Sequence, residues 1–351
     1  MAVASDTRQS GPSSPGPAPR RARGGEGLSL VKKFLTLREG SIIVVSVITV
    51  VYFSVTVSQF FTGGNFTNTL QYFCFLAIMG AGQVFVMTLG EIDLSVGALY
   101  LITPFFYWKF SEAGVPLVPS LVLALVVAGI IGAFNGFFTA YIGIASFVVT
   151  LAMLFALSGV ALIMSHSEQI TTPGTSVTQV GTFAQIFGAG TYSELIWALG
   201  IVVVLQIVLS FSRTGLYTVA TGGNRIAAAE AGINTRGIVL RNFVLCAVTA
   251  GFAGVLEAVR TSSMTPDPSG SNQFLLYSIA GVIIGGTAMT GGEGTVVGAL
   301  IGAFFIGVLQ DGLTVKSVPA TYEFLWLGIA ILIAMTINRL VRRVRLGSGR
   351  A

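Results

Sequence analysis

The chain has 351 residues, of which 53% are hydrophobic and only 9% are charged, and its formal net charge is +5. Soluble domains carry about 25% charged residues, so the composition excludes an ordinary soluble protein and indicates a polytopic membrane protein. The positive charge does not indicate a nucleic-acid partner, because twelve of the 19 basic residues lie before residue 40 or after residue 338. Such terminal clustering is typical of segments kept on the cytoplasmic side of a membrane.

The N-terminal segment, residues 1–39, is predicted to be a disordered, basic cytoplasmic tail. Up to about residue 29 it is rich in Pro, Gly, Ser and Arg and has almost no apolar residues to bury. The apolar run that follows, 41–60, is too long for a signal-peptide core and lacks a small-x-small cleavage site. We therefore expect 41–60 to be an uncleaved first span.

Ten apolar segments are candidates for membrane spans, which need about 20 mostly apolar residues each. They predict an all-α polytopic membrane protein of about ten transmembrane helices over residues 40–340, followed by a basic cytoplasmic tail at 341–351. The predicted spans are 41–60, 70–89, 96–112, 117–140, 146–165, 194–211, 242–260, 274–290, 295–312 and 323–338.

The distribution of basic residues predicts the orientation of these spans. With the N-terminus inside, ten spans return the C-terminus to the inside, and 16 of the 19 Lys and Arg residues then face the cytoplasm. This asymmetry favours cytoplasmic termini over the inverse topology. The location implied is a plasma membrane, crossed several times.

The basic inner connection, 213–238, is predicted to contain a short helix at 225–231. Asn224 is suited to cap its N-terminus, and Gly232 stands just past its end. Three alanines would give this helix a smooth face of small residues, namely Ala227, Ala228 and Ala231.

Residues 90–97 read G-E-I-D-L-S-V-G and place two carboxylates between long apolar runs. Charged groups are costly near hydrocarbon, so the stretch is expected at a break between the second and third spans. Asp93 is then placed to cap the third span by accepting amide hydrogens near Ser95 and Val96. Glu91 is expected at an aqueous edge or in contact with the transported solute.

Other polar residues lie in or near the predicted spans, where such groups usually face the bundle interior or a water-filled path. Glu257 stands one helical turn before Arg260, so an ion pair between these two is the simpler expectation. Glycines pack the helices closely, and the pairs at 285–286 and 291–292 are expected to break a helix. The candidates for a translocation path are Gln83, Glu91, Asn135, Glu257, Gln310 and Asp311.

A weak internal repeat is also present. Shifting the chain by 201 residues lays 78–99 on 279–300, with the tetrapeptide Val-Gly-Ala-Leu in common. Repeats are common in transporters.

No enzyme motif accompanies these features. The sequence has no G-x-x-x-x-G-K-[ST] phosphate loop, no G-x-S-x-G and no H-E-x-x-H. The single histidine and two cysteines, Cys74 and Cys246, which lie in apolar runs, do not indicate a metal site or a disulfide. We therefore expect no catalytic residue, metal or bound cofactor, and instead a pore-forming subunit driven by a partner.

Three segments carry a family resemblance: GEIDLSVGA (90–98), ATGGNRIAAAEAGINTRGIVLRNFVLCAVTAGFAGVLEAVR (220–260) and GGTAMTGGEGTVVGALIGAFFIGVLQDGLTV (285–315). In order and spacing they resemble the permease subunits of bacterial ribose/xylose/arabinose-type ABC importers. The signature residues in the first segment are Gly90, Asp93, Leu94, Ser95 and Gly97.

The resemblance implies a ten-helix importer fold in the bacterial inner membrane. It implies a second permease copy (the same chain or a close paralogue), an ATPase subunit that uses ATP below the membrane, and an extracytoplasmic solute-binding protein above it, with lipids around the spans. It further implies that the segment Gly222–Gly237 forms the coupling helix that sits in a groove of the ATPase. The expected coupling residues are Asn224, Arg225, Ala227, Ala228, Glu230, Ala231 and Gly232.

The sequence departs from the family pattern at two places, and both leave the solute open. Glu91 stands where the family motif usually has glycine, and Gln310 with Asp311 stands where two asparagines are frequent. A branched-chain amino-acid importer permease shares the architecture and is the nearest alternative. An ion-coupled carrier and a membrane scaffold are the alternatives from other classes.

Overall fold

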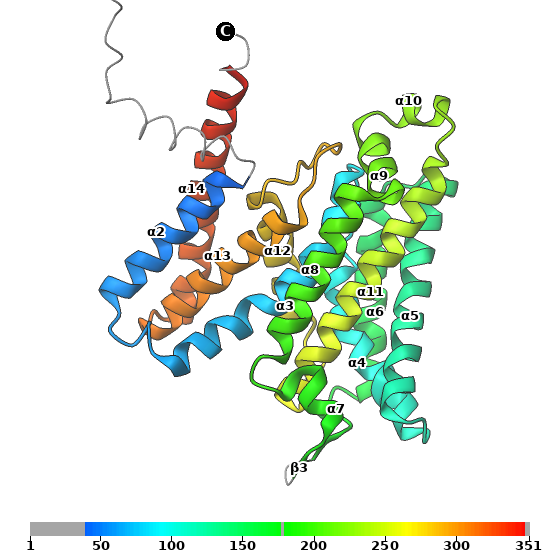
Figure 1. Ribbon diagram of the computed structural model, residues 1–351. Coiled ribbons are helices and arrows are strands. Elements are labelled where there is room, and N and C mark those ends of the chain that lie inside the picture. Colours follow the sequence, from blue (N-terminus) through cyan, green and yellow to red (C-terminus); the bar gives the residue numbers. More distant parts are fainter. Residues whose placement is uncertain (1–38, 177–178, 348–351) are drawn as a thin grey trace, which may run out of the picture.

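The computed structural model describes residues 39–176 and 179–347, and it consists mainly of helices (Figure 1). The predicted tail at 1–39 lies outside these residues apart from Glu39. At the other end the last helix continues to Gly347, which is well beyond the predicted end of the tenth span at residue 338. The final four residues of the predicted C-terminal tail also lie outside the described chain.

A helix occupies each of the ten predicted spans. In addition, the π-helical turn η2 (Phe138–Ile142) directly continues α5 (Leu117–Phe137). The helices are α2 (Gly40–Thr56), α3 (Gly63–Thr88), α4 (Val96–Glu112), α5 (Leu117–Phe137), α6 (Ser146–Ser165), α8 (Ser193–Phe211), α11 (Thr235–Thr261), α12 (Pro268–Ile284), α13 (Val296–Val315) and α14 (Ala320–Gly347).

Six of these helices are long and apolar enough to cross a membrane: α3, α5 with η2, α6, α8, α11 and α13. Shorter apolar stretches lie within α2 and α14, at Ile42–Thr56 and Phe324–Ile337. The helices α4 and α12 have 17 residues each. The six long helices establish a multi-pass membrane protein, and the figure of ten crossings stays a prediction.

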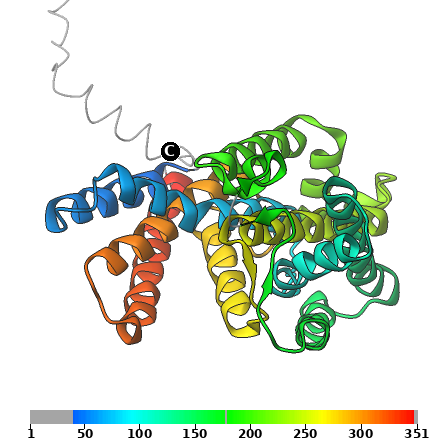
Figure 2. The ribbon, with the colours of Figure 1, turned by 90° about the horizontal axis from the view of Figure 1, so that it is seen from below.

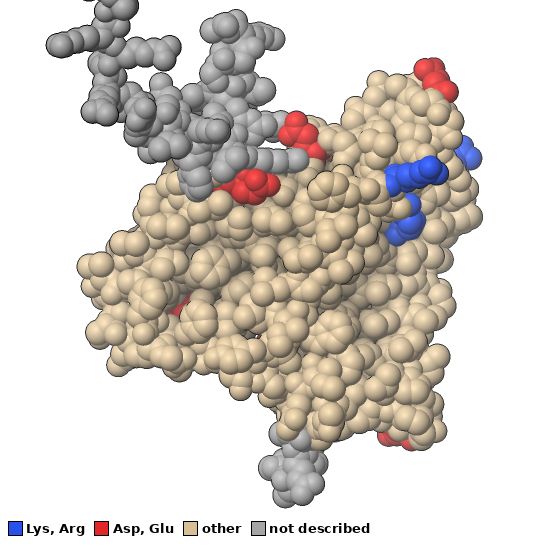
Figure 3. Space-filling model, viewed as in Figure 1, with Lys and Arg blue, Asp and Glu red and all other residues tan. Residues whose placement is uncertain are grey.

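The centre of the bundle is formed by α3 and α11, whose apolar windows are 89% and 72% buried. Seen from below in Figure 2, α2, α13 and α14 lie on one side of α3, and α4, α5 and α6 lie with α11 on the other. By contrast, α5, α6 and α8 bury only about a third of their apolar windows. The face in Figure 3 is accordingly almost uncharged between its two ends, as expected of a surface that contacts hydrocarbon.

The two ends of the molecule differ. At the bottom of Figure 1 lie α7 (Thr182–Ala184), η3 (Gln185–Ala189) and two short antiparallel strand pairings. In these pairings β1 (Ile170–Thr171) is antiparallel to β4 (Ser263–Met264), and β2 (Thr175–Ser176) is antiparallel to β3 (Gln179–Val180). At the opposite end α9 (Arg213–Gly223) and α10 (Arg225–Glu230) connect α8 to α11 and project beyond them (Figure 1).

Candidate functional site

The projecting helix α10 has the capped form that the sequence predicts. The Asn224 side chain accepts hydrogen bonds from the amides of Ile226 and Ala227, at 3.1 and 3.0 Å. Past its other end, Gly232 adopts a φ of +81°, a conformation that favours glycine. The predicted range 225–231 thus differs from the observed helix, Arg225–Glu230, by one residue.

The exposed face of α10 differs from the predicted one. Ala228 is only 5% exposed and packs against the rest of the chain, so it does not belong to an outward small-residue face. Ala227 and Ala231 are exposed, as predicted. The most prominent side chain is Ile226, which is 74% exposed. Periodicity alone could not reveal this, because the direction in which a two-turn helix faces depends on what it packs against.

Glu91 lies beside α10. The Arg225 Nη2 atom donates a hydrogen bond to the Glu91 carboxylate at 2.8 Å, and the Glu91 side chain is 16% exposed. The structure therefore places Glu91 at the end of the molecule that carries α10, where it links the break after α3 to the start of that short helix.

Three chain segments meet in backbone contact next to this ion pair. The Gly292 amide donates to the Thr88 carbonyl at 2.8 Å. A Cβ atom on Gly222 would overlap the same carbonyl, and one on Gly291 would lie 2.8 Å from the Gly222 carbonyl oxygen. This contact joins the α3–α4 break, the end of α9 and the α12–α13 loop. We call it the glycine junction. Only residues without a side chain allow the three backbones to approach so closely.

The two halves of the internal repeat lie side by side in this junction. Gly90 and Gly291, which correspond under the shift of 201 residues, have φ values of +79° and +83°. A Cβ on Gly291 would lie 2.9 Å from the Gly90 amide nitrogen. The glycine pairs at 285–286 and 291–292 end α12 and separate it from α13, which confirms the predicted helix break.

Further hydrogen bonds attach α9 to the long helices, and no sequence motif indicated them. Arg241, on α11, donates to the Thr214 hydroxyl at 3.1 Å. Asn242 donates to the Thr218 hydroxyl at 3.1 Å and to the Phe85 carbonyl at 3.2 Å, which joins α9, α11 and α3. These hydrogen bonds join α9 directly to α3 and α11.

Asp93 lies in a different environment from Glu91, within a fully buried polar cluster. Its Oδ1 atom accepts hydrogen bonds from the Ser95 amide at 2.9 Å and from the Ser95 hydroxyl at 2.6 Å. The predicted hydrogen bond from the Ser95 amide is confirmed. The N-cap residue of α4 is however Ser95 itself, so Asp93 closes the turn before the helix and does not cap its first amides. The carboxylate thus fixes the turn that leads into α4.

Gln83 and Asn135 complete the buried polar cluster. Asn135 donates to the Ser95 hydroxyl, and Gln83 donates to the Asp93 carbonyl, both at 2.8 Å. Each of the side chains of Gln83, Asp93 and Asn135 retains one buried oxygen without a hydrogen-bond partner. These side chains therefore face the interior of the helix bundle, where they hold the α3–α4 break against α5.

The other predicted path residues lie elsewhere. Glu257 forms the predicted ion pair with Arg260, and Arg260 also approaches Glu194 at 3.6 Å. Asp311 is buried and accepts hydrogen bonds from Asn65 and Thr69. Gln310, its neighbour, is partly buried. Glu194 was missed by the sequence analysis, although a lone carboxylate in the first turn of an apolar helix is a usable signal.

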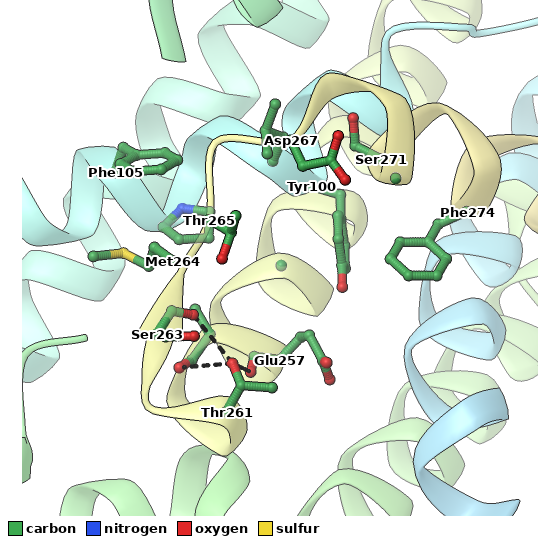
Figure 4. Close-up of a pocket in the computed structure, with 15 residues that line it drawn as sticks. Tyr100, Phe105, Glu257, Thr261, Ser263, Met264, Thr265, Asp267, Ser271 and Phe274 are labelled. Atoms are coloured by element: carbon green, nitrogen blue, oxygen red, sulfur yellow. Dashed lines mark hydrogen bonds between the residues drawn. The ribbon is translucent and has the colours of Figure 1, made fainter. Parts of the chain in front are cut away.

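The predicted path residues are consequently brought to several separate places, and the structure does not gather them into one channel. A polar hollow lies beside Glu257. It is a cavity of about 380 Å³ between α4, α11 and α12 (Figure 4). It lies at the C-terminal end of α11, and α10 precedes the opposite end of that helix. Its lining includes Tyr100, Glu257, Thr265, Asp267, Ser271 and Phe274.

An apolar helical bundle with six helices long and apolar enough to cross a membrane defines a polytopic membrane protein. The chain belongs to the family described as branched-chain amino acid transport system / permease component, whose model matches residues 65–335.

Curated relatives cover most of the chain. It is 32% identical to a xylose/arabinose import permease protein of Sulfolobus acidocaldarius over 90% of this chain and 88% of the relative. It is also 32% identical to a ribose import permease protein of Escherichia coli, over 80% and 87% respectively. A D-allose transport system permease protein of Escherichia coli is 29% identical over 87% and 92%. No solved structure matches the chain.

These matches confirm the resemblance drawn from the three segments. The relatives are permease subunits of ABC transporters and not enzymes, so the chain is a transporter subunit of the sugar-importing ABC permease family. The amino-acid alternative is not favoured, because these relatives are named for sugars.

Proposed function

We propose that this chain forms the membrane path of an ABC importer for a simple sugar, as a permease of ten transmembrane helices with both termini in the cytoplasm. The similarity to permeases named for xylose, arabinose, ribose and allose, over at least 80% of this chain, is the observation that carries the proposal. Importers of this class take their energy from a separate ATPase, and this chain carries no phosphate-binding loop of its own.

In this proposal α10 is the contact with the ATPase. It projects from the bundle, it is capped by Asn224, and its Ile226 side chain is 74% exposed. Sixteen of the chain's 19 basic residues then face the cytoplasm, as the positive-inside rule favours. ATP binding would move α10, and the hydrogen bonds from α9 to α11 and α3 would carry that movement into the bundle.

The partners follow from the same family membership. We infer an ATPase subunit, a second permease copy that completes the path, and a solute-binding protein that delivers the sugar at the end that carries α7 and β3. The bundle itself is surrounded by lipid, in contact with the exposed apolar faces of α5, α6 and α8.

The test is reconstitution in liposomes together with the ATPase and the binding protein. We expect ATP-dependent accumulation of at least one of D-ribose, D-xylose, L-arabinose and D-allose. Uptake of leucine in place of all four sugars would favour the amino-acid importer. Uptake by the permease alone, driven by an ion gradient, would establish the carrier, and absence of any transport with all partners present would contradict the proposal.

A further inference from the structure

The cavity beside Glu257 has the size and composition of a small-molecule site. Its volume of about 380 Å³ lies within the range of ligand pockets, roughly 300 to 1,000 Å³. It is formed where the middle of α4 faces the end of α11 and the first turns of α12, and the β1–β4 pairing holds the connecting segment over it. Since α10 lies at the other end of α11, the proposed function places this cavity on the extracytoplasmic side.

Two aromatic side chains, Tyr100 and Phe274, border the cavity. Their ring centroids are 5.6 Å apart, and their planes are inclined at 73°. Tyr100 is only 8% exposed, yet its hydroxyl makes no hydrogen bond within the described chain and points into the cavity (Figure 4). A buried tyrosine hydroxyl usually has a partner, so this one is free to bond a ligand.

Two carboxylates give the cavity its charge. Glu257 is fixed by its ion pair with Arg260, and Glu194 approaches the Arg260 Nε atom at 3.6 Å. The Oδ1 atom of Asp267 accepts the Ser269 amide at 2.9 Å at the start of α12, and its Oδ2 atom makes no hydrogen bond within the described chain. No Lys or Arg side chain lines the cavity. An anion entering it would therefore be repelled.

We propose that this cavity binds a neutral monosaccharide on its way into the bundle. Apolar ring faces and C–H groups pack against Tyr100 and Phe274, while sugar hydroxyls donate to the carboxylates of Asp267 and Glu257 and accept from the Tyr100 hydroxyl. The same carboxylates exclude sugar phosphates and sugar acids. This inference rests on the proposed function, and it adds to that function a binding site and a charge preference within the permease itself.

The experiment measures binding without the partners. Saturation-transfer NMR is recorded on the full chain in nanodiscs with D-ribose, D-xylose, L-arabinose or D-allose, and with D-ribose 5-phosphate. We expect transfer to at least one neutral sugar and none to the phosphate. Tyr100→Phe, which removes only the hydroxyl, should weaken binding about tenfold, equivalent to about 1.4 kcal/mol. Asp267→Asn should also weaken it while preserving the cap, because asparagine caps helices as well as aspartate.

Matched controls are Tyr192→Phe and Glu168→Gln, two exposed positions that do not line the cavity. The inference would be overturned if Tyr100→Phe and Tyr192→Phe bound the sugar equally well. It would also be overturned if saturation transfer to D-ribose 5-phosphate were stronger than transfer to every neutral sugar. A third outcome is ATP-driven sugar uptake by the full importer together with no saturation transfer from the permease alone. This outcome would overturn the inference and leave the proposed function intact. Failure of uptake itself would instead count against the proposed function.

Discussion

Arg225, the first residue of α10, donates a 2.8 Å hydrogen bond to Glu91, which stands 134 positions earlier in the chain. The pair connects the break after α3 to the short helix that we assign to the ATPase contact. The resemblance implies a glycine at the position of Glu91, so this tether would be an addition to the family motif. A link to α10 is therefore an alternative to the solute contact that the sequence suggested for Glu91.

Breaking the ion pair is expected to affect coupling more than stability. The side chains of Arg225 and Glu91 are 45% and 16% exposed, and ion pairs near the surface contribute about 0–1 kcal/mol. Glu91→Gln should therefore leave the unfolding temperature nearly unchanged while lowering the sugar transported per ATP hydrolysed, because α10 loses a direct link to the bundle. Both quantities can be measured in proteoliposomes.

The control for this prediction is Glu112→Gln, which breaks the exposed Lys109–Glu112 pair on α4 and should change neither quantity. The double exchange Glu91→Arg with Arg225→Glu should restore part of the coupling. Unchanged transport per ATP in Glu91→Gln would contradict the prediction. If Glu91→Gln altered the sugar preference and left the sugar transported per ATP unchanged, Glu91 would be assigned to the solute path.

The exposed face of α10 yields a second prediction. Ile226 is 74% exposed and Ala228 is 5% exposed, so Ile226→Asp should prevent association with the ATPase while the permease folds normally. Ala228→Glu should abolish uptake too, but it should also lower the yield of folded protein, because it places a charge against the protein's own interior. Co-purification with the ATPase and size-exclusion profiles separate the two effects. Normal ATPase association by Ile226→Asp would show that another surface docks.

Much of this architecture was predictable, since hydrophobic runs, caps and glycine pairs are local signals. The ranges of the ten helices, the Asn224 cap and the Glu257–Arg260 pair depend on residues close together in sequence. The long-range partners of Glu91 and Ser95 were not predictable in this way. Arg225 reaches Glu91, and Asn135 reaches Ser95, only through tertiary packing, and a sequence pattern does not encode such long-range pairing.

The glycine junction gives the third prediction. A methyl group at Gly222 would overlap the Thr88 carbonyl and lie 2.8 Å from the Gly292 amide nitrogen. Both obstacles are backbone atoms, so Gly222→Ala should force the three segments apart and destabilise the protein by about 1–3 kcal/mol. Gly200→Ala, in α8, is the control, because nothing lies within 4 Å of its added methyl group. Equal melting temperatures for the two variants would contradict the close contact.

The last prediction concerns Asp93 and can be followed with the protein's own thiols. Cys74 and Cys246 are both free and buried, so a thiol-reactive fluorophore reports unfolding on heating. Asp93→Ala removes the acceptor for the Ser95 amide and hydroxyl, and loss of a comparable side-chain acceptor at the start of a helix costs about 1–2 kcal/mol. Because the site is fully buried, the stranded donors add to that loss.

Asp93→Asn distinguishes hydrogen bonding from charge at this position. Asparagine keeps a side-chain oxygen for the Ser95 amide, so most of the stability should be retained if accepting this hydrogen bond is the role of Asp93. The orphaned Oδ2 atom becomes an amide group that can donate, and buried acceptors on Gln83 and Asn135 lack partners in the same cluster. An Asn variant as unstable as Asp93→Ala would show that the negative charge itself holds the α3–α4 break. A stable Asn variant that no longer transports would assign that charge to the transport cycle.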